Sequence, residues 1–335
     1  MTPMKLLVRM PNWVGDAVLA LPVLDALRRS QPGAELWVAG RPWIQDLVRP
    51  DGAVRGVLGV PENGGLKTLR ASAADLSRHA FDAALLLTNS FASALLVTLA
   101  KIPERWGYAR DLRTLLLTRP VPLPSPAGLH QADYYRHLLS SLEIEPGPRE
   151  VRLDVSDDEA RQAGQRLAGA GRPAGRPLVI FSPGASYGPA KRWPASRFAE
   201  LGRLFESRTD AAIALVGAPG EEPLAAAIAA GLGRAPLDFT GRTTLRELMA
   251  LAGQARVFVT NDTGPMHLAN ALGVAVVAVF GPTDPAATGP LSPPAAVLKK
   301  DVPCWPCLYR TCPYDHRCMQ RIGAEDVFAA ARPYL

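Results

Sequence analysis

The segment VTNDTGPMHLANALG, from Val259 to Gly273, decides the fold because it joins three kinds of local structure. It begins by completing a strand pattern, RVFVT, and it ends in PMHLANAL, which has the apolar spacing of a helix. Between them stand Asn, Asp, Thr and Gly, more polar turn-forming residues than a tight turn needs. A strand, a short polar loop and a helix in succession form the repeating unit of a parallel α/β sheet.

The same alternation occurs on both sides of a Pro- and Gly-rich stretch at 143–177, which is the best linker candidate. We therefore expect an α/β chain with two Rossmann-like, doubly wound domains facing a central cleft at the carboxyl ends of their strands. Strands are predicted at 5–10, 35–40, 82–88, 211–217, 237–241, 256–260 and 274–280, with another in PLVIFSPG. Helices are predicted at 16–29 (kinked or split by Pro22), 66–78, 90–99, 194–206, 221–232, 245–252, 265–272 and 324–332.

The composition allows large cores, because 48% of the 335 residues are hydrophobic and only 20% are charged. A net charge of +6 fits an anionic substrate, a membrane surface or nucleic acid. No stripe of basic and aromatic residues appears, which disfavours nucleic acid. The start has no secretory signal pattern, and the longest uncharged run, 83–100, is interrupted by polar residues. We expect a cytoplasmic protein, soluble or peripheral on a membrane.

The polar loop Asn261–Gly264 is suited to an anion. The first N–H groups of a helix have no partner, and the helix dipole makes that end positive, so a phosphate fits there. Thr263 can add a hydroxyl donor, Gly264 allows close approach to the backbone, and His267 lies in the first turn. Simple capping of the helix by Asp262 or Thr263 is the alternative.

A second strand-to-helix loop, FSPGASYGPAKRWP at 181–194, carries Ser186 and the adjacent cations Lys191 and Arg192. It is not a P-loop, and no G-x-G-x-x-G occurs. Two anion-competent loops in one domain favour a diphosphate site, although Lys191 and Arg192 could be solvated surface charges. A third loop, VGAPGEEPL, offers Glu221 and Glu222 for ribose hydroxyls or, equally, for capping a helix.

The N-terminal half supplies a candidate base and a basic region. Asp16 follows the first strand in RMPNWVGDAVLALP and could be a helix cap or a general base that deprotonates an acceptor hydroxyl. The segment 101–119 has five cations against two acids, and a later stretch adds further polar groups. An anionic acceptor or a solvated face would both explain them. The acceptor-binding candidates are Arg105, Arg113, His130 and Gln131.

The four cysteines lie together near the C-terminus with the spacing C-x2-C-x4-C-x5-C. The first pair has a zinc-knuckle spacing, but the second pair does not match the usual repeat. A bound metal, reduced thiols and a disulfide all remain open, and we expect no metal or other cofactor in catalysis. The cysteines are Cys304, Cys307, Cys312 and Cys318.

Taken together, PNWVGDAVLALP, SPGASYGPAKRWP, TNDTGPMHLANALGVAVVAVFGPTDP and CWPCLYRTCP resemble the lipopolysaccharide heptosyltransferases, most closely those of type II. The likeness runs in order over nearly the whole chain. It implies a GT-B fold with an acceptor domain at 1–160 and a donor domain at 175–320. It also implies that a C-terminal helix within 321–335 packs back on the N-terminal domain.

The resemblance further implies an inverting, metal-independent transfer of L-glycero-D-manno-heptose from ADP-heptose to the inner-core heptose of heptosyl-Kdo2-lipid A. The enzyme would work at the inner face of the inner membrane. Asp16 matches the proposed base, Lys191 the cation near the leaving phosphate, and Glu222, with Glu221 as a rival, the ribose-binding acid. The other implied donor-binding residues are Ser186, Asp262, Thr263, Gly264 and His267.

Three alternatives remain at this point. Another GT-B transferase of lipopolysaccharide core assembly or a nucleotide-sugar epimerase could use the same donor loops. A non-catalytic protein that binds a nucleotide sugar or a lipid would need the same loops but no base.

Overall fold

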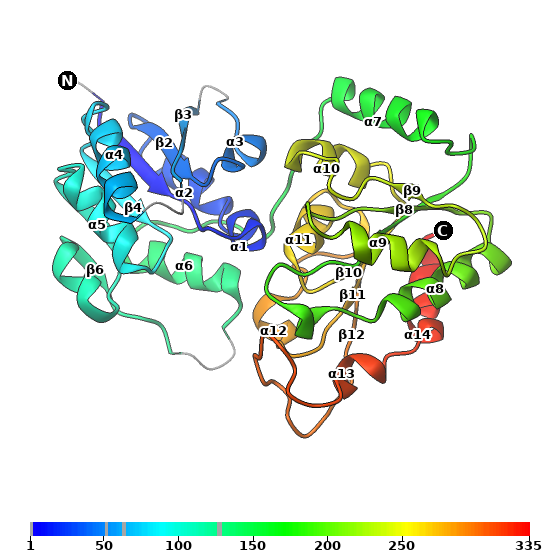
Figure 1. Ribbon diagram of the computed structural model, residues 1–335. Helices are drawn as coiled ribbons and strands as arrows, with labels where there is room; N and C mark the ends of the chain where they lie inside the picture. Colours follow the sequence, from blue (N-terminus) through cyan, green and yellow to red (C-terminus); the bar gives the residue numbers. More distant parts are fainter. Residues whose placement is uncertain (1–2, 51–52, 62–64, 126–128) are drawn as a thin grey trace. The chain divides into compact units, whose positions relative to one another are not determined.

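The computed structural model describes residues 3–50, 53–61, 65–125 and 129–335. The chain divides into two compact units, Met1–Val151 (unit 1) and Arg152–Leu335 (unit 2), each built on one six-stranded sheet. Figure 1 shows the strands of each sheet between covering helices. Among the described residues, no helix is both long enough and apolar enough to cross a bilayer.

Unit 1 has strand order β3-β2-β1-β4-β5-β6, with all neighbouring strands parallel. This is the Rossmann order, in which the chain changes direction across the sheet between β1 and β4. The carboxyl ends of those two strands therefore form the switch point where ligands bind in such sheets. The strands are β1 (Lys5–Arg9), β2 (Glu35–Gly40), β3 (Val54–Gly59), β4 (Ala83–Leu86), β5 (Glu104–Tyr108) and β6 (Arg119–Val121).

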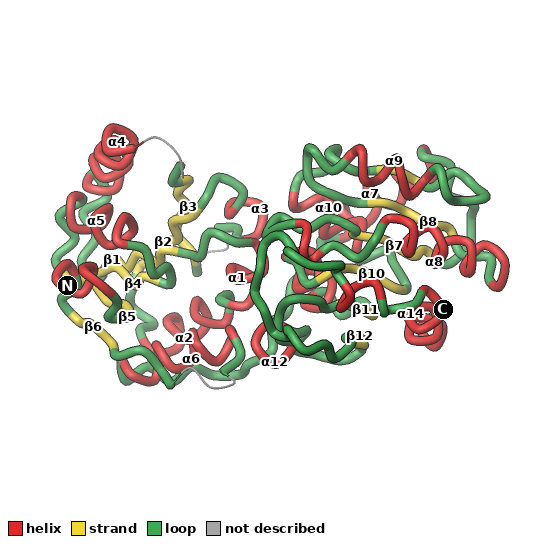
Figure 2. The backbone as a smooth tube through the Cα atoms, turned by 60° about the horizontal axis from the view of Figure 1, so that its bottom comes forward, coloured by secondary structure: helices red, strands yellow, loops and turns green. Residues whose placement is uncertain are grey.

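The predicted split of the first helix is confirmed, since one helix ends at Leu19 and the next begins with Pro22. α4 and α5 lie side by side over one face of the sheet, as Figure 2 shows. Their apolar residues share a buried cluster with Leu7, Ala84 and Leu86 of the strands. The helices are α1 (Val14–Leu19), α2 (Pro22–Ser30), α3 (Ile44–Leu47), α4 (Gly65–Ser77), α5 (Phe91–Leu99), the 3₁₀ helix η1 (Asp111–Leu116) and α6 (Gln131–Ser141).

Unit 2 repeats this topology with the order β12-β11-β10-β7-β8-β9, again entirely parallel. Its switch point lies between β7 and β10. The segment Val259–Gly273 forms the end of β10, the loop after it and the next helix, as predicted. The strands are β7 (Leu178–Ser182), β8 (Ala212–Leu215), β9 (Leu237–Asp238), β10 (Val257–Asn261), β11 (Ala275–Val279) and β12 (Ala295–Leu298).

Both faces of this sheet are buried, which explains its continuous apolar strands. Alternate strand residues divide between two cores: Val179 and Phe181 face one, whereas Leu178 and Ile180 face the other. The first core includes α8 (Ala195–Arg208), α9 (Glu222–Ala229) and α14 (Ala324–Ala331), and the second includes α7 (Asp157–Gly169), α10 (Leu245–Ala252) and α11 (Gly264–Ala271). Short helices are η2 (Pro189–Lys191), α12 (Pro285–Thr288), α13 (Arg317–Gln320) and η3 (Arg332–Tyr334).

The C-terminal helix differs from the expectation that it packs back on the N-terminal domain. Val327, Phe328 and Ala331 of α14 are buried in the first core of unit 2, against α8 and β11. The apolar side of an amphipathic helix is stabilised by burial against any complementary apolar surface. For α14 that surface is the sheet face of its own unit.

Charged contacts fix the pair of helices α7 and α10 over the second core. A capping box of Ser156 and Glu159 begins α7, and the Glu159 carboxylate accepts two bonds from Arg246 of α10, at 2.7 and 2.8 Å. These bonds, chiefly those from Arg246, hold the pKa of Glu159 well below its usual range. Unit 2 thus gains a mostly buried, bidentate ion pair near its start.

Candidate functional site

At the switch point of unit 2, one amide joins the two loops that the sequence singled out. Asn261, the last residue of β10, is fully buried. Its Nδ2 donates to the carbonyls of Pro183 (2.7 Å) and Gly184 (3.2 Å), and its Oδ1 accepts from the backbone N–H of Trp193 (3.0 Å). The loop after β7 is therefore held in place by the residue that ends β10.

The same two loops are joined by a buried ion pair. Lys191 Nζ lies 2.5 Å from Asp262 Oδ2 and 3.3 Å from the Asp262 carbonyl, and Lys191 is only 9% exposed. Asp262 Oδ2 also accepts from the hydroxyls of Thr283 (2.6 Å) and Thr288 (3.3 Å). The interpretation of Lys191 as a solvated surface charge is therefore wrong. Two of the three ammonium donors are used, which leaves one for a ligand.

The start of α11 is not capped by a side chain, so the capping alternative is wrong. Thr263 is the N-cap residue, but its hydroxyl makes no bond to a first-turn N–H and lies 3.3 Å from Thr260 Oγ1. The Asp262 carboxylate is directed to Lys191 instead. Gly264 begins the helix and His267 is buried in its first turn. The positive end of α11 thus lies beside the Lys191 pair.

The carboxylates of Glu221 and Glu222, which follow β8, lie against different loops. The Glu221 carboxylate accepts from the Ala218 N–H at 2.9 Å and lies against Gly184, where a Cβ would clash with it. Glu222 is exposed, accepts from the Gly220 N–H at 2.7 Å and lies against Gly241 after β9. Glu221 is therefore the acid beside the switch point.

Residues near the C-terminus support the loop that carries Lys191. The Tyr187 hydroxyl donates to the Leu308 carbonyl (2.6 Å), and the Ala190 N–H donates to the Arg310 carbonyl (3.0 Å). His316 Nε2 lies 2.7 Å from the Ala190 carbonyl. Ser186 stands exposed in the middle of this loop.

All four cysteines line one pocket behind this contact, together with Ala190 and His316. All four are free thiols in the structure, and no disulfide joins them. Burial, and then the neighbouring thiols, raise the pKa of the Cys318 thiol. Within the described ranges, no group of three or more His, Cys, Asp or Glu residues is arranged to hold a metal ion.

In unit 1, Asp16 lies in the first turn of α1, directly after the carboxyl end of β1. The N-cap is Trp13, so Asp16 is not the cap residue. Burial, and then the nearby Asp16 carboxylate, raise the pKa of Tyr135 well above its usual range, while Gln131 hydrogen-bonds the same tyrosine. Asp16 and Gln131 are thus brought to one place by α1 and α6. His130 is the N-cap residue of α6, and its Nδ1 accepts from the Ala132 N–H at 3.1 Å.

Two further cations, which the sequence pattern did not indicate, lie where β1 and β2 end. Arg9, at the end of β1, is 6% exposed and donates to the Met10 carbonyl (2.6 Å) and Asn12 Oδ1 (2.8 Å). Burial, followed by the charge of Arg41 after β2, lowers the pKa of Arg9 to about 10. The Arg41 guanidinium carbon lies 6.0 Å from the centroid of the Trp13 ring, which is 45% exposed. The sequence did contain a signal for Arg9, because a charged residue at the end of an apolar strand is unusual.

The other two acceptor candidates, Arg105 and Arg113, bond to groups of their own unit. Arg105 donates to the carbonyls of Leu116 (2.6 Å) and Ile102 (2.6 Å). Arg113 is 1% exposed and donates to the Thr88 carbonyl at 2.7 Å and Asn89 Oδ1 at 3.2 Å. The net charge of +3 that the sequence of 101–119 suggests is therefore not all presented at the surface.

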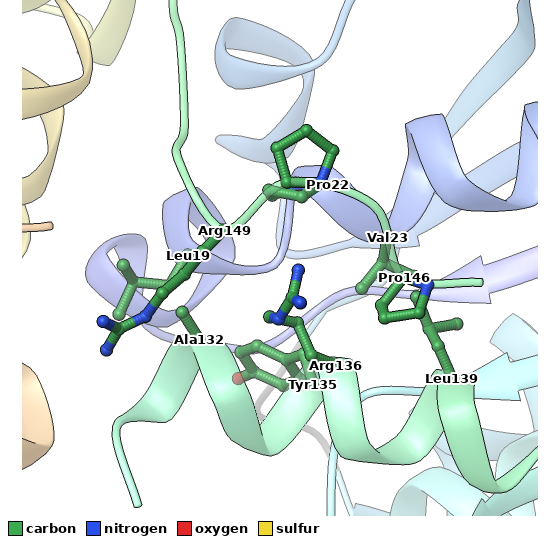
Figure 3. A pocket seen from close by; sticks show the side chains of 10 residues that line it. Leu19, Pro22, Val23, Ala132, Tyr135, Arg136, Leu139, Pro146 and Arg149 are labelled. Carbon is green, nitrogen blue, oxygen red and sulfur yellow. The ribbon is translucent and has the colours of Figure 1, made fainter. Parts of the chain in front are cut away.

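A small pocket lies between α6 and the Pro146–Arg149 segment, as Figure 3 shows. Its apolar wall comes from Leu19, Val23 and Leu139 among others. Its two cations are already engaged, because Arg149 pairs with Asp133 at 3.1 Å and Arg136 donates to the Gly147 carbonyl. The pocket therefore offers little to an anion, and we assign it a packing role.

The chain matches the model of glycosyltransferase family 9 (heptosyltransferase) over residues 69–317. It is 30% identical to lipooligosaccharide heptosyltransferase 2 of Haemophilus ducreyi, over 88% of each chain. It is 28% identical to the solved structure of the Escherichia coli ADP-heptose lipopolysaccharide heptosyltransferase II. That superposition covers 99% of this chain and 98% of the E. coli chain, with a TM-score of 0.84. The structure of E. coli heptosyltransferase WaaC with ADP-2-deoxy-2-fluoro heptose superposes with a TM-score of 0.68 at 21% identity, over 99% of this chain and all of WaaC.

The chain therefore belongs to glycosyltransferase family 9, the heptosyltransferases. The resemblance inferred from the motifs is confirmed, and relatives at about 30% identity carry the type 2 name. The GT-B fold is confirmed by the two parallel six-stranded sheets and by the likeness to solved heptosyltransferases.

Proposed function

We propose that the protein transfers L-glycero-D-manno-heptose from ADP-heptose to the inner-core heptose of a heptosyl-Kdo2-lipid A acceptor. The observation that carries the proposal is the buried Lys191–Asp262 pair beside the uncapped start of α11. A cation, a free helix N-terminus and a ribose-competent acid at one switch point suit a nucleoside diphosphate. The names of the type 2 relatives support the sugar and the acceptor.

The donor's diphosphate would lie between the loop of Lys191 and the N-terminus of α11. The third donor of the Lys191 ammonium, the Gly264 N–H and the positive end of the α11 dipole stabilise the charge that grows on the departing ADP. Ser186 in the loop after β7, and Thr263 and His267 at the start of α11, add polar groups. In this proposal Glu221, rather than Glu222, holds the ribose hydroxyls, because its carboxylate lies against Gly184. This arrangement supplies positive charge without a divalent metal.

Asp16 is the proposed base. The acceptor hydroxyl oxygen forms a bond to the anomeric carbon on the face opposite ADP, and Asp16 takes its proton. The bond from the anomeric carbon to the phosphate oxygen breaks, and its electron pair leaves with ADP. The configuration at the anomeric carbon is therefore inverted.

An anionic acceptor suits the surroundings of Asp16. Arg9 and Arg41 place two positive charges at the ends of β1 and β2. The exposed ring of Trp13 gives a flat apolar face three residues before Asp16, against which a sugar ring can pack. The acceptor is a membrane lipid, so the protein would act peripherally at the inner face of the inner membrane.

Purified protein, ADP-heptose and a deacylated, water-soluble heptosyl-Kdo2-glucosamine acceptor test the proposal. We expect ADP release that depends on the acceptor, a product one heptose heavier with inverted anomeric configuration, and turnover that persists in EDTA. Isomerised donor formed without acceptor would instead favour the epimerase, and binding of donor with no turnover at all would favour the non-catalytic alternative.

A further inference from the structure

The side chain of Arg310 lies near that of Lys191, because both cations contact one aromatic ring. The Arg310 guanidinium carbon is 5.3 Å from the centroid of the Tyr187 ring, and Lys191 Nζ is 4.9 Å from the same centroid. The two cations are therefore no farther apart than the sum of these distances. Lys191 is buried, whereas Arg310 is exposed and forms no ion pair with any residue that the structure describes.

Backbone contacts fix the position of Arg310 relative to the loop after β7. The Arg310 carbonyl accepts from the Ala190 N–H at 3.0 Å and lies against Gly188, where a Cβ would clash with it. Two residues earlier, the Leu308 carbonyl accepts from the Tyr187 hydroxyl at 2.6 Å. The main chain at Arg310 is thus bonded to the donor loop, and only its side chain is left to reach a ligand.

The charges already in the donor site leave a need for a further cation. Lys191 and Asp262 form one ion pair, so their charges cancel, and the nearby Glu221 carboxylate adds a negative charge. Both phosphate groups of a nucleotide sugar are negatively charged. Arg310 brings positive charge that no described carboxylate neutralises by pairing with it. A guanidinium also suits phosphate, because its planar fork can donate two parallel hydrogen bonds.

We propose that Arg310 is a second cation of the donor site and binds, together with Lys191, the phosphate that bears the heptose. Tyr187 is the positioning residue, since a guanidinium stacked on a ring keeps its N–H edges free for phosphate oxygens. Arg310 then also stabilises the charge that grows on this phosphate as ADP departs. The inference rests on the proposed function, because it assigns Arg310 to the donor of that reaction.

Titration calorimetry with ADP and with AMP tests the contact without any acceptor. Arg310→Gln should lower the ADP affinity about 10-fold, because it removes hydrogen bonds to a charged group. The AMP affinity should stay nearly unchanged, since AMP lacks the second phosphate. Arg310→Lys keeps the charge without the planar fork and should restore part of the loss. Arg321→Gln removes another exposed cation of unit 2, at the end of α13, and should bind both nucleotides like the wild type.

A double-mutant cycle tests the positioning role of Tyr187. Tyr187→Leu removes the ring, so Arg310→Gln should cost much less ADP affinity in that background than in the wild type. Tyr187→Phe keeps the ring and should preserve most of the ADP affinity. If the losses from Tyr187→Leu and Arg310→Gln simply add, the ring does not position the guanidinium, and this part of the proposal is wrong.

Melting temperatures and turnover of the deacylated acceptor complete the experiment. Arg310→Gln should melt like the wild type and lose about 10-fold in kcat. Equal losses of ADP and AMP affinity, with or without a lower melting temperature, would show a structural role and overturn the assignment. Unchanged ADP affinity in Arg310→Gln, beside normal heptosyl transfer by the wild type, would overturn the inference alone. ADP affinity that depends on Arg310 in a wild type that transfers no heptose would count against the proposed function alone.

Discussion

The two units share one topology, but their switch points are built differently. In unit 2 the cation Lys191 has a carboxylate partner, and Asn261 bonds both loops into one arrangement. In unit 1 the buried Arg9 and Arg113 bond to carbonyl and amide oxygens, and no carboxylate among the described residues pairs with either. Buried bonds thus hold the two loops of unit 2 in one preorganised arrangement. The switch point of unit 1 combines the buried Arg9 with the carboxylate of Asp16, which, after burial, raises the pKa of Tyr135.

The largest effect should come from the proposed base of unit 1. Asp16→Asn keeps the shape of the side chain but cannot take a proton, so kcat should fall by about 10²–10⁴. Calorimetric titration should show unchanged ADP affinity, because that site belongs to unit 2. Asp25→Asn, on the exposed face of α2, is the matched control. Near-normal turnover of Asp16→Asn would show that Asp16 is not the base and that unit 1 does not supply it.

In unit 2, catalysis and stability should be separable. Lys191→Met leaves the Asp262 carboxylate buried without its cation, so we expect a loss of about 3–5 kcal/mol in the free energy of unfolding as well as a large fall in turnover. Adding Asp262→Asn removes the orphaned charge and should restore most of the stability but none of the turnover. Denaturant unfolding and steady-state kinetics measure the two. Recovery of activity in the double variant would show that Lys191 serves only the fold.

A smaller effect should distinguish the adjacent acids. Glu221→Gln should weaken ADP binding about 10-fold, because a hydrogen bond to a charged group contributes roughly 1.5–3 kcal/mol. Glu222→Gln is its built-in control and should change the affinity little, since that carboxylate faces Gly241. Titration calorimetry with ADP measures both. A larger loss of ADP affinity in Glu222→Gln than in Glu221→Gln would identify Glu222 as the ribose-binding acid.

The smallest effect concerns acid stability. The pKa of Glu159 is lowered in the folded state, so its contribution is fully present above its unfolded pKa of about 4.3 and is lost as the pH falls below that value. Glu159→Gln should therefore lower the melting temperature of unit 2 at neutral pH, and the difference from wild type should shrink below about pH 4. A difference independent of pH would exclude the ion pair as its cause.

Local patterns predicted much of the fold. Continuous apolar runs predicted β1, β2 and β4, because a strand buried on both faces has apolar residues at successive positions. The strand–loop–helix pattern at 259–273 predicted the switch point of unit 2. The missed strands β3, β5, β6 and β12 are short or interrupted by Gly, Pro or charged residues, as in VRGVLG and ERWGY. Their strand state depends on neighbours that a local pattern does not contain.

The site was less predictable than the fold. The motif indicated Lys191 and Asp262 separately, but their direct pairing depends on two strands far apart in sequence. The burial of Lys191 contradicts the usual exposure of lysine, and nothing local distinguishes Glu221 from Glu222. Arg113 looked like one surface charge among five and is instead buried by a long-range bond to Thr88.

The hydroxyls of Thr283 and Thr288 have a consequence for repeated turnover. Because both already donate to Asp262, hydroxyl groups as well as Lys191 balance the charge of that carboxylate. In the proposed reaction, Lys191 keeps its bond to Asp262 and uses its remaining donor for an incoming phosphate. The nucleotide site would then empty and refill with the Lys191–Asp262 pair intact throughout.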